Sequence, residues 1–142
     1  CQTNSVCVQP VADIAVVSAM AYIIGKLKDE ISVPFGVNVV KNPIATIDLG
    51  AATGAKFGRS CFSGAYMGEY GVYVSNSGEA IRHRKALGIE DMKLLFKVNP
   101  EAECLSCNKE TFRLLQNPLC SANFADGLMC CRERQQEQNR TM

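Results

Sequence analysis

Apolar residues recur at helical spacing over the first predicted element, Asp13–Glu30. They fall three and four residues apart, at Ile14, Val17, Met20, Ile24 and Leu27, which predicts an amphipathic helix. The apolar stripe is broad, as expected for a helix that packs against a sheet.

Nearly continuous apolar runs follow, rich in β-branched residues, and they predict strands at Ser32–Val40, Lys56–Phe62 and Met92–Val98. Runs of this kind, rather than strict alternation, are typical of strands buried on both faces of a parallel sheet. Helices are predicted between them, over Pro43–Thr53 and Gly78–Leu87. A right-handed parallel α/β arrangement follows, either an open doubly wound sheet or a barrel.

Residues at the ends of the predicted helices support these bounds. Asn42 can cap a helix that begins at Pro43, and Gly54 can end it. Asn76 or Ser77 can cap the next helix, and Gly88 can end that one.

Beyond Pro100 we predict a short helix at Lys109–Gln116, a short strand at Ala125–Cys131 and a disordered polar tail at Arg132–Met142. Neither a G-x-G-x-x-G turn nor a Walker A motif occurs, so a dinucleotide-binding Rossmann unit is disfavoured.

Composition narrows the function classes. The net charge is +1, which favours neither nucleic acid nor an anionic membrane as partner. The longest apolar run, Ile14–Gly25, is too short to span a membrane, and no signal peptide is recognised. The chain begins with Cys1, which suggests a fragment or a processed product. The 8 cysteines are interpreted as mostly reduced, in a soluble intracellular protein of the cytoplasm or of an organelle such as the mitochondrion.

Several motifs resemble those of the BtpA family, in the same order and at the same spacing. They are Pro34–Asn42, Ala52–Phe57 followed by Arg59, Phe62–Tyr66 with Gly71 behind it, and Arg82–Gly88. The resemblance covers Val16–Glu101, and around Ile89–Lys93 the chain is more similar to animal members than to photosynthetic ones.

The resemblance implies a (β/α)8 barrel related to the ribulose-phosphate-binding barrels. The family's named member is a peripheral thylakoid protein linked to photosystem I biogenesis, and most members have no assigned reaction. A whole barrel takes about 250 residues, so we expect residues 1–131 to form a partial barrel, about strands three to five and possibly six, and residues 132–142 to be a tail. The phosphate site of such barrels usually follows strands seven and eight, which have no counterpart here, so it is not carried over.

Candidate ligand-binding residues lie where the predicted strands end, because functional groups gather there in parallel barrels. They are Asn38, Lys41, Asn42, Arg59, Tyr66, Lys97 and Asn99. Asn38 and Asn42 could instead satisfy turn and cap groups of the backbone. A guanidinium in an apolar strand, as at Arg59, needs an acidic partner or an anionic ligand.

The glycine-rich segment Gly64–Gly71 is predicted to be a loop, either a mobile lid or a flexible surface loop, and its Glu69 is the candidate acid/base. Cys104 and Cys107 form a C-x-x-C that could bind zinc only with distant cysteines, could be redox-active, or could be incidental. His83, the only histidine, is predicted to be solvent-exposed on a basic helix face.

Two functions remain open at this point, and no reaction or cofactor follows from the residues. In the first, the parent barrel, meaning the complete barrel of which this chain is expected to be a part, binds a small anionic metabolite at the C-terminal ends of its strands. In the second, the protein is a non-enzymatic assembly or stability factor that acts through protein contacts, with homo-oligomers formed through exposed barrel edges.

Overall fold

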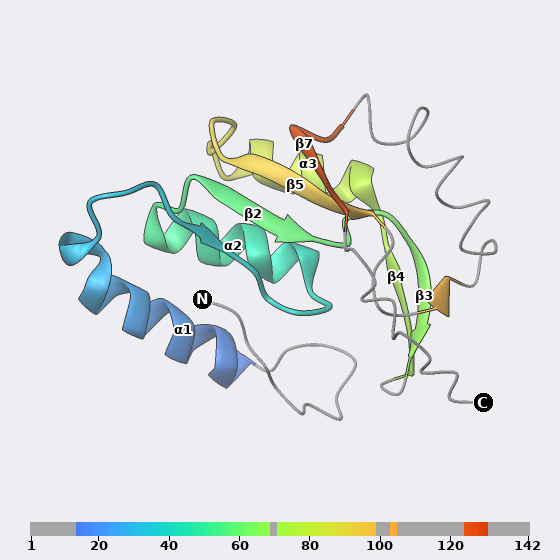
Figure 1. The fold of residues 1–142 in the computed structure, drawn as a ribbon, viewed down its shortest axis with the longest axis horizontal. Coiled ribbons are helices and arrows are strands. Elements are labelled where there is room, and N and C mark those ends of the chain that lie inside the picture. Colours follow the sequence, from blue (N-terminus) through green and yellow to red (C-terminus); the bar gives the residue numbers. More distant parts are fainter. Residues whose placement is uncertain (1–13, 69–70, 99–102, 105–123, 131–142) are drawn as a thin grey trace, which may run out of the picture.

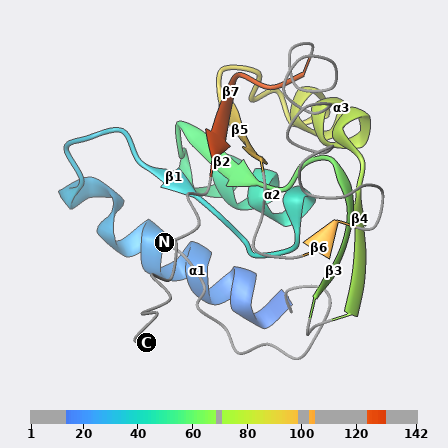
Figure 2. The ribbon, with the colours of Figure 1, turned by 45° about the vertical axis from the view of Figure 1, so that its right-hand side comes forward.

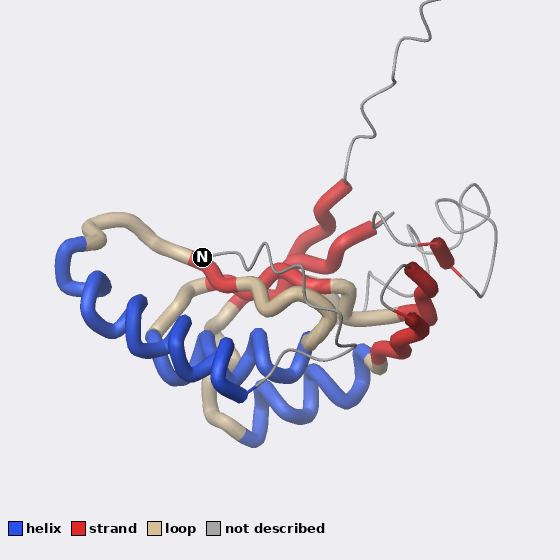
Figure 3. Tube along the Cα trace, turned by 90° about the horizontal axis from the view of Figure 1, so that it is seen from below, coloured by secondary structure: helices blue, strands red, loops and turns tan. Residues whose placement is uncertain are grey.

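The computed structural model describes residues 14–68, 71–98, 103–104 and 124–130. Its main sheet has four parallel strands in the order β1-β2-β5-β7, formed by Gly36–Val37, Phe57–Ser60, Lys93–Val98 and Gly127–Cys130. Three helices cover one face of this sheet (Figures 1 and 3): α1 (Ile14–Leu27), α2 (Pro43–Thr53) and α3 (Ser77–Ala86). The predicted parallel α/β fold is confirmed, and the described strands form a curved section that does not close into a barrel.

The predicted caps explain where α2 and α3 begin and end. The Asn42 side chain accepts a hydrogen bond from the Ala45 amide at 3.0 Å, and the Asn76 side chain accepts one from the Glu79 amide at 3.3 Å. Gly54 follows α2 with φ 77°, a left-handed conformation that glycine adopts without a steric penalty. Asn76, rather than Ser77, is therefore the cap of α3.

Several element bounds differ from the prediction. Helix α1 ends at Leu27, and a 3-10 turn, η1 (Lys28–Glu30), follows it. Strand β1 is much shorter than the predicted Ser32–Val40, because the chain turns at Val39, whose carbonyl accepts a hydrogen bond from the Asn42 amide at 3.2 Å. The strand predicted near Ala125 is confirmed as β7, which pairs in parallel with β5.

The predicted loop at Gly64–Gly71 is wrong. Residues Gly64–Gly68 form β3 and Gly71–Ser75 form β4, an antiparallel hairpin in which Gly68 pairs with Gly71. With β6 (Glu103–Cys104) they make a second sheet in the order β4-β3-β6. The glycines lie at the ends of these strands, and the tyrosines and valines between them have high strand propensity. The glycines therefore mark the ends of the two hairpin strands and do not indicate a loop.

The core lies between the main sheet and its helices, in two clusters. Val37, Val39, Leu49 and Met92 pack with α1 in the first, and the second contains Ile47, Ala80, Leu94 and Phe96. No helix in the described part of the chain is long and apolar enough to cross a membrane. The helix predicted at Lys109–Gln116 and the tail Arg132–Met142 lie outside the described residues.

Candidate functional site

The C-terminal ends of β1, β2 and β5 lie at one edge of the main sheet, because the three strands are parallel neighbours. Four predicted site residues lie at or near this edge: Asn38 and Lys41 after β1, Arg59 in β2 and Lys97 in β5. Figures 1 and 2 show the second sheet beyond the same edge. The fold thus brings together residues that are up to 59 positions apart in the sequence (97 − 38).

Arg59 and Lys97 lie on the face of the sheet that no described helix covers. Gly58 and Ser60, on either side of Arg59, are buried. On β5, Leu94 and Phe96 are buried and pack in the cluster beneath α2 and α3. Since side chains alternate along a strand, Arg59 and Lys97 point to the opposite face. The register pairs Arg59 with Leu95, so Lys97 is two positions further toward the C-terminal end on the next strand. The two cations are therefore diagonal neighbours on the face that no described helix covers, which we call the open face.

Asn38 is half-buried between the buried Val37 and Val39. The same alternation places it on the open face, one residue beyond the pairing of Val37 with Gly58.

Arg59 has a buried polar atom without a partner among the described residues. Its Nε atom is buried and has no hydrogen-bond partner within the described part of the chain. None of the ion pairs between described residues includes it. The predicted structural ion pair is thus not found among the described residues, which favours an anionic ligand as the partner.

The main sheet carries cations and no acidic residue. Arg59, Lys93 and Lys97 lie in its strands, whereas Asp and Glu are absent from all four. Lys93 lies at the start of β5 and approaches the Asp126 carboxylate at 3.6 Å. Positive charge near the C-terminal end of the sheet is therefore not balanced by carboxylates of the strands themselves.

The turn that carries Lys41 is held by the start of α2. The buried Thr46 hydroxyl accepts a hydrogen bond from the Val39 amide at 3.0 Å and lies 3.0 Å from the Asn42 carbonyl, to which it can donate. Within this turn Lys41 has φ 61°, the one positive value among the described non-glycine residues. The left-handed conformation costs a residue with a side chain about 1–2 kcal/mol. Such strain is often found at functional sites, and the Nζ atom of Lys41 is buried.

The other predicted site residues are placed as follows. Asn42 has its side-chain oxygen committed to the cap of α2. Tyr66 lies in β3, where its backbone pairs with Tyr73 and Cys104. Glu69, Asn99 and Cys107 lie outside the described residues. No cluster of metal-ligating side chains occurs in the described part.

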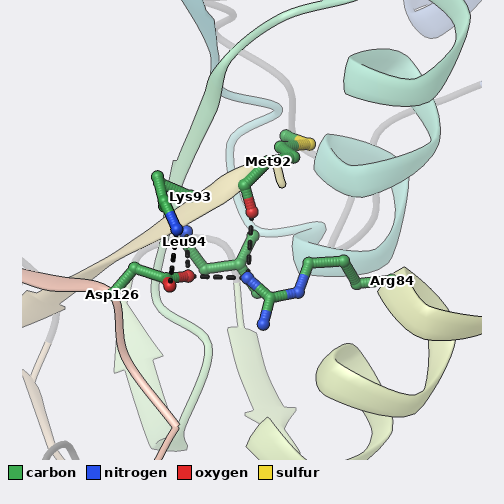
Figure 4. A network of polar contacts seen from close by, with 5 residues as sticks. All are labelled: Arg84, Met92, Lys93, Leu94 and Asp126. Atoms are coloured by element: carbon green, nitrogen blue, oxygen red, sulfur yellow. Dashed lines mark hydrogen bonds and ion pairs between the residues drawn. The ribbon is translucent and has the colours of Figure 1, made fainter. Parts of the chain in front are cut away.

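Two groups of polar contacts were not predicted from the sequence. His83 is only partly exposed, and its Nε2 atom lies 2.6 Å from the Asp48 carboxylate, a contact that links α3 to α2. Asp126 accepts hydrogen bonds from Arg84 at 2.6 Å and from the Leu94 amide at 2.9 Å, and Arg84 also donates to the Met92 carbonyl at 2.9 Å (Figure 4). This Arg84–Asp126 network lies at the N-terminal end of β5, opposite to the candidate site. Residues at the N-terminal end of barrel strands serve stability.

Comparisons with known proteins agree with the fold. The profile of the BtpA family matches residues 7–135. The chain is 48% identical over 111 residues to the putative sgc region protein SgcQ of Escherichia coli K12, covering 78% of this chain and 41% of that protein. It is 33% identical over 88 residues to the photosystem I biogenesis protein BtpA of Synechocystis, covering 61% of this chain and 30% of that protein.

No solved structure matches the chain significantly. The chain spans less than half the length of the curated relatives it matches. The similarity to animal members stays a prediction. With a profile match over most of its length, the chain belongs to the BtpA family.

Proposed function

We propose that the parent barrel binds a small anionic metabolite at the C-terminal ends of its parallel strands, through Arg59, Lys97 and Lys41. One observation supports this most directly. The buried Nε atom of Arg59 has no hydrogen-bond partner within the described residues, on a face whose strands contain no carboxylate. An anion there would satisfy the guanidinium and offset the repulsion between neighbouring cations.

Asn38, Tyr66 and Asn99 remain proposed ligand contacts, as does Asn42, whose amide nitrogen the cap does not use. Glu69 remains the proposed acid/base. No reaction class follows from this set, so the proposal concerns binding.

Isothermal titration of the purified protein with inorganic phosphate and pyrophosphate tests the proposal. We expect Arg59→Gln to weaken binding by roughly tenfold or more, because a hydrogen bond to a charged group contributes about 1.5–3 kcal/mol. Arg82→Gln is the matched control, since Arg82 is an exposed arginine on α3. Equal affinity in the Arg59→Gln variant and the unaltered chain would reject the role of Arg59.

A second candidate is a non-enzymatic assembly or stability factor acting through protein contacts. Strands β1 and β7 are the outer strands of the described sheet, and Leu128 on β7 is 45% exposed. The Synechocystis relative is named for photosystem I biogenesis, which is consistent with such a role. Homo-oligomers through these barrel edges are part of this candidate. A stable monomer in light scattering would count against assembly by barrel edges.

A further inference from the structure

The second sheet ends in an exposed strand with an unusual side-chain pattern. Strand β4 is terminal in the order β4-β3-β6, and in Figure 2 it is the outermost of the three. One edge of its backbone therefore has no partner strand in the described part of the chain. Val72 and Val74 on this strand are 54% and 75% exposed.

The two valines share one face of the hairpin, because they are two positions apart on a strand. Natural proteins usually protect edge strands with lysine, proline, a bulge or a covering element. Neither β3 nor β4 contains a charged residue or proline, and their pairing is regular from Gly64 with Ser75 to Gly68 with Gly71. Among the described residues, this edge thus has no charge, proline or bulge, three of the devices that prevent strand pairing.

Charge indicates which partner fits this edge. A strand that carried a net charge would repel its own copy, whereas Gly71–Ser75 is neutral along its length. Antiparallel pairing of a strand with itself is symmetric and forms a closed dimer about a two-fold axis. A basic or acidic peptide would find no complementary charge on either hairpin strand.

We infer that β4 is a dimerisation edge, which pairs antiparallel with β4 of a second copy of this chain. The two three-stranded sheets then join into one continuous sheet, and Val72 and Val74 of each copy pack beside those of the other. This interface is separate from the barrel edges β1 and β7 and from the cations at Arg59 and Lys97. It does not depend on the proposed anion site.

Light scattering coupled to size-exclusion chromatography tests this inference over a range of protein concentrations. The unaltered chain should show twice its mass of 15.4 kDa. Val74→Lys and Val72→Lys should each shift the mass to that of one chain, because a lysine on the edge introduces repulsion between copies. Val33→Lys is the matched control, since Val33 is 66% exposed and lies outside the hairpin, and it should remain dimeric.

Val74→Thr separates loss of pairing from loss of folding, because threonine keeps the strand propensity and adds no charge. We expect this variant to dimerise more weakly than the unaltered chain and more strongly than Val74→Lys, with the same circular dichroism spectrum. A monomeric unaltered chain would overturn the inference. So would a dimer that persists in both lysine variants, which would place the interface elsewhere, such as on the barrel edges.

Discussion

Arg84 Nη1 lies 2.6 Å from Asp126 Oδ2, although the two residues are 42 positions apart in the sequence. The contact joins the last turn of α3 to the residue before β7, and the Leu94 amide donates to the same carboxylate oxygen. Arg84 also reaches the Met92 carbonyl (Figure 4). One carboxylate thus attaches β7 to both its neighbouring strand and the helix layer.

Because the Asp126 carboxylate is charged, the free energy of unfolding should depend on pH in the acid range. Burial raises the pKa of its carboxyl group, but the hydrogen bond from Leu94, the hydrogen bond and charge of Arg84, and the charge of Lys93 outweigh it, so the pKa lies below its ordinary value. The contribution to stability is complete above the unfolded pKa of about 3.9 and is lost as pH falls through the folded pKa. Urea unfolding between neutral and acid pH should therefore show a shallower decline for Asp126→Asn than for the unaltered chain. Identical pH profiles would contradict this role.

Arg84→Gln should lower the free energy of unfolding by about 1–3 kcal/mol, because it leaves Asp126 and the Met92 carbonyl without this donor. The Arg84 side chain is only 13% exposed, so water cannot fully replace it. Arg82→Gln, on an exposed position of the same helix, should change stability by no more than about 0.5 kcal/mol. Chemical denaturation of both variants measures the difference, and equal losses would show that the network adds little.

Thr46→Val should destabilise the turn that carries Lys41. It leaves the buried Val39 amide without the hydroxyl that accepts its hydrogen bond at 3.0 Å, at a cost of about 1–3 kcal/mol. Thr46→Ser keeps the hydroxyl and should lose less. Denaturation curves compare the two variants, and a larger loss for serine would mean that methyl packing, not the hydroxyl, holds this turn.

Gly58→Ala should destabilise the core between β2 and α2. A Cβ atom at this position would lie 2.8 Å from the Met92 methyl and 3.1 Å from the Thr46 methyl, and both side chains are buried. Overpacking of this kind typically costs about 1–3 kcal/mol. Gly25→Ala is the control, since nothing lies within 4 Å of its added Cβ, and in the exposed part of α1 it should stabilise by about 0.5–1 kcal/mol. A thermal melt of each variant checks the opposite signs.

The sequence alone determined the elements whose signals are local. Asn42 followed by Pro43 predicted the start of α2, and Gly54 its end, because a cap, a fixed φ and a left-handed glycine each act within one turn of helix. The apolar runs predicted the parallel strands for a similar reason, since burial on both faces leaves its pattern in a few consecutive residues. Lys97 could be named as a candidate because it lies near the end of a predicted strand, and Arg59 also because a guanidinium in an apolar run needs a partner.

Only the tertiary structure decided which distant residues meet. The segment Gly64–Gly68 has its strand character from pairing with Gly71–Ser75 and with Glu103–Cys104, and glycine content alone suggested a loop. The partners of His83 and Arg84 come from other elements, so their exposure could not be predicted from the charges of one helix face. The turn that contains the left-handed Lys41 is flanked by Val39 and Asn42, both of which contact the buried hydroxyl of Thr46. Contacts between separate elements therefore set the pairing of the hairpin with β6, the Arg84–Asp126 network and the shape of the candidate site.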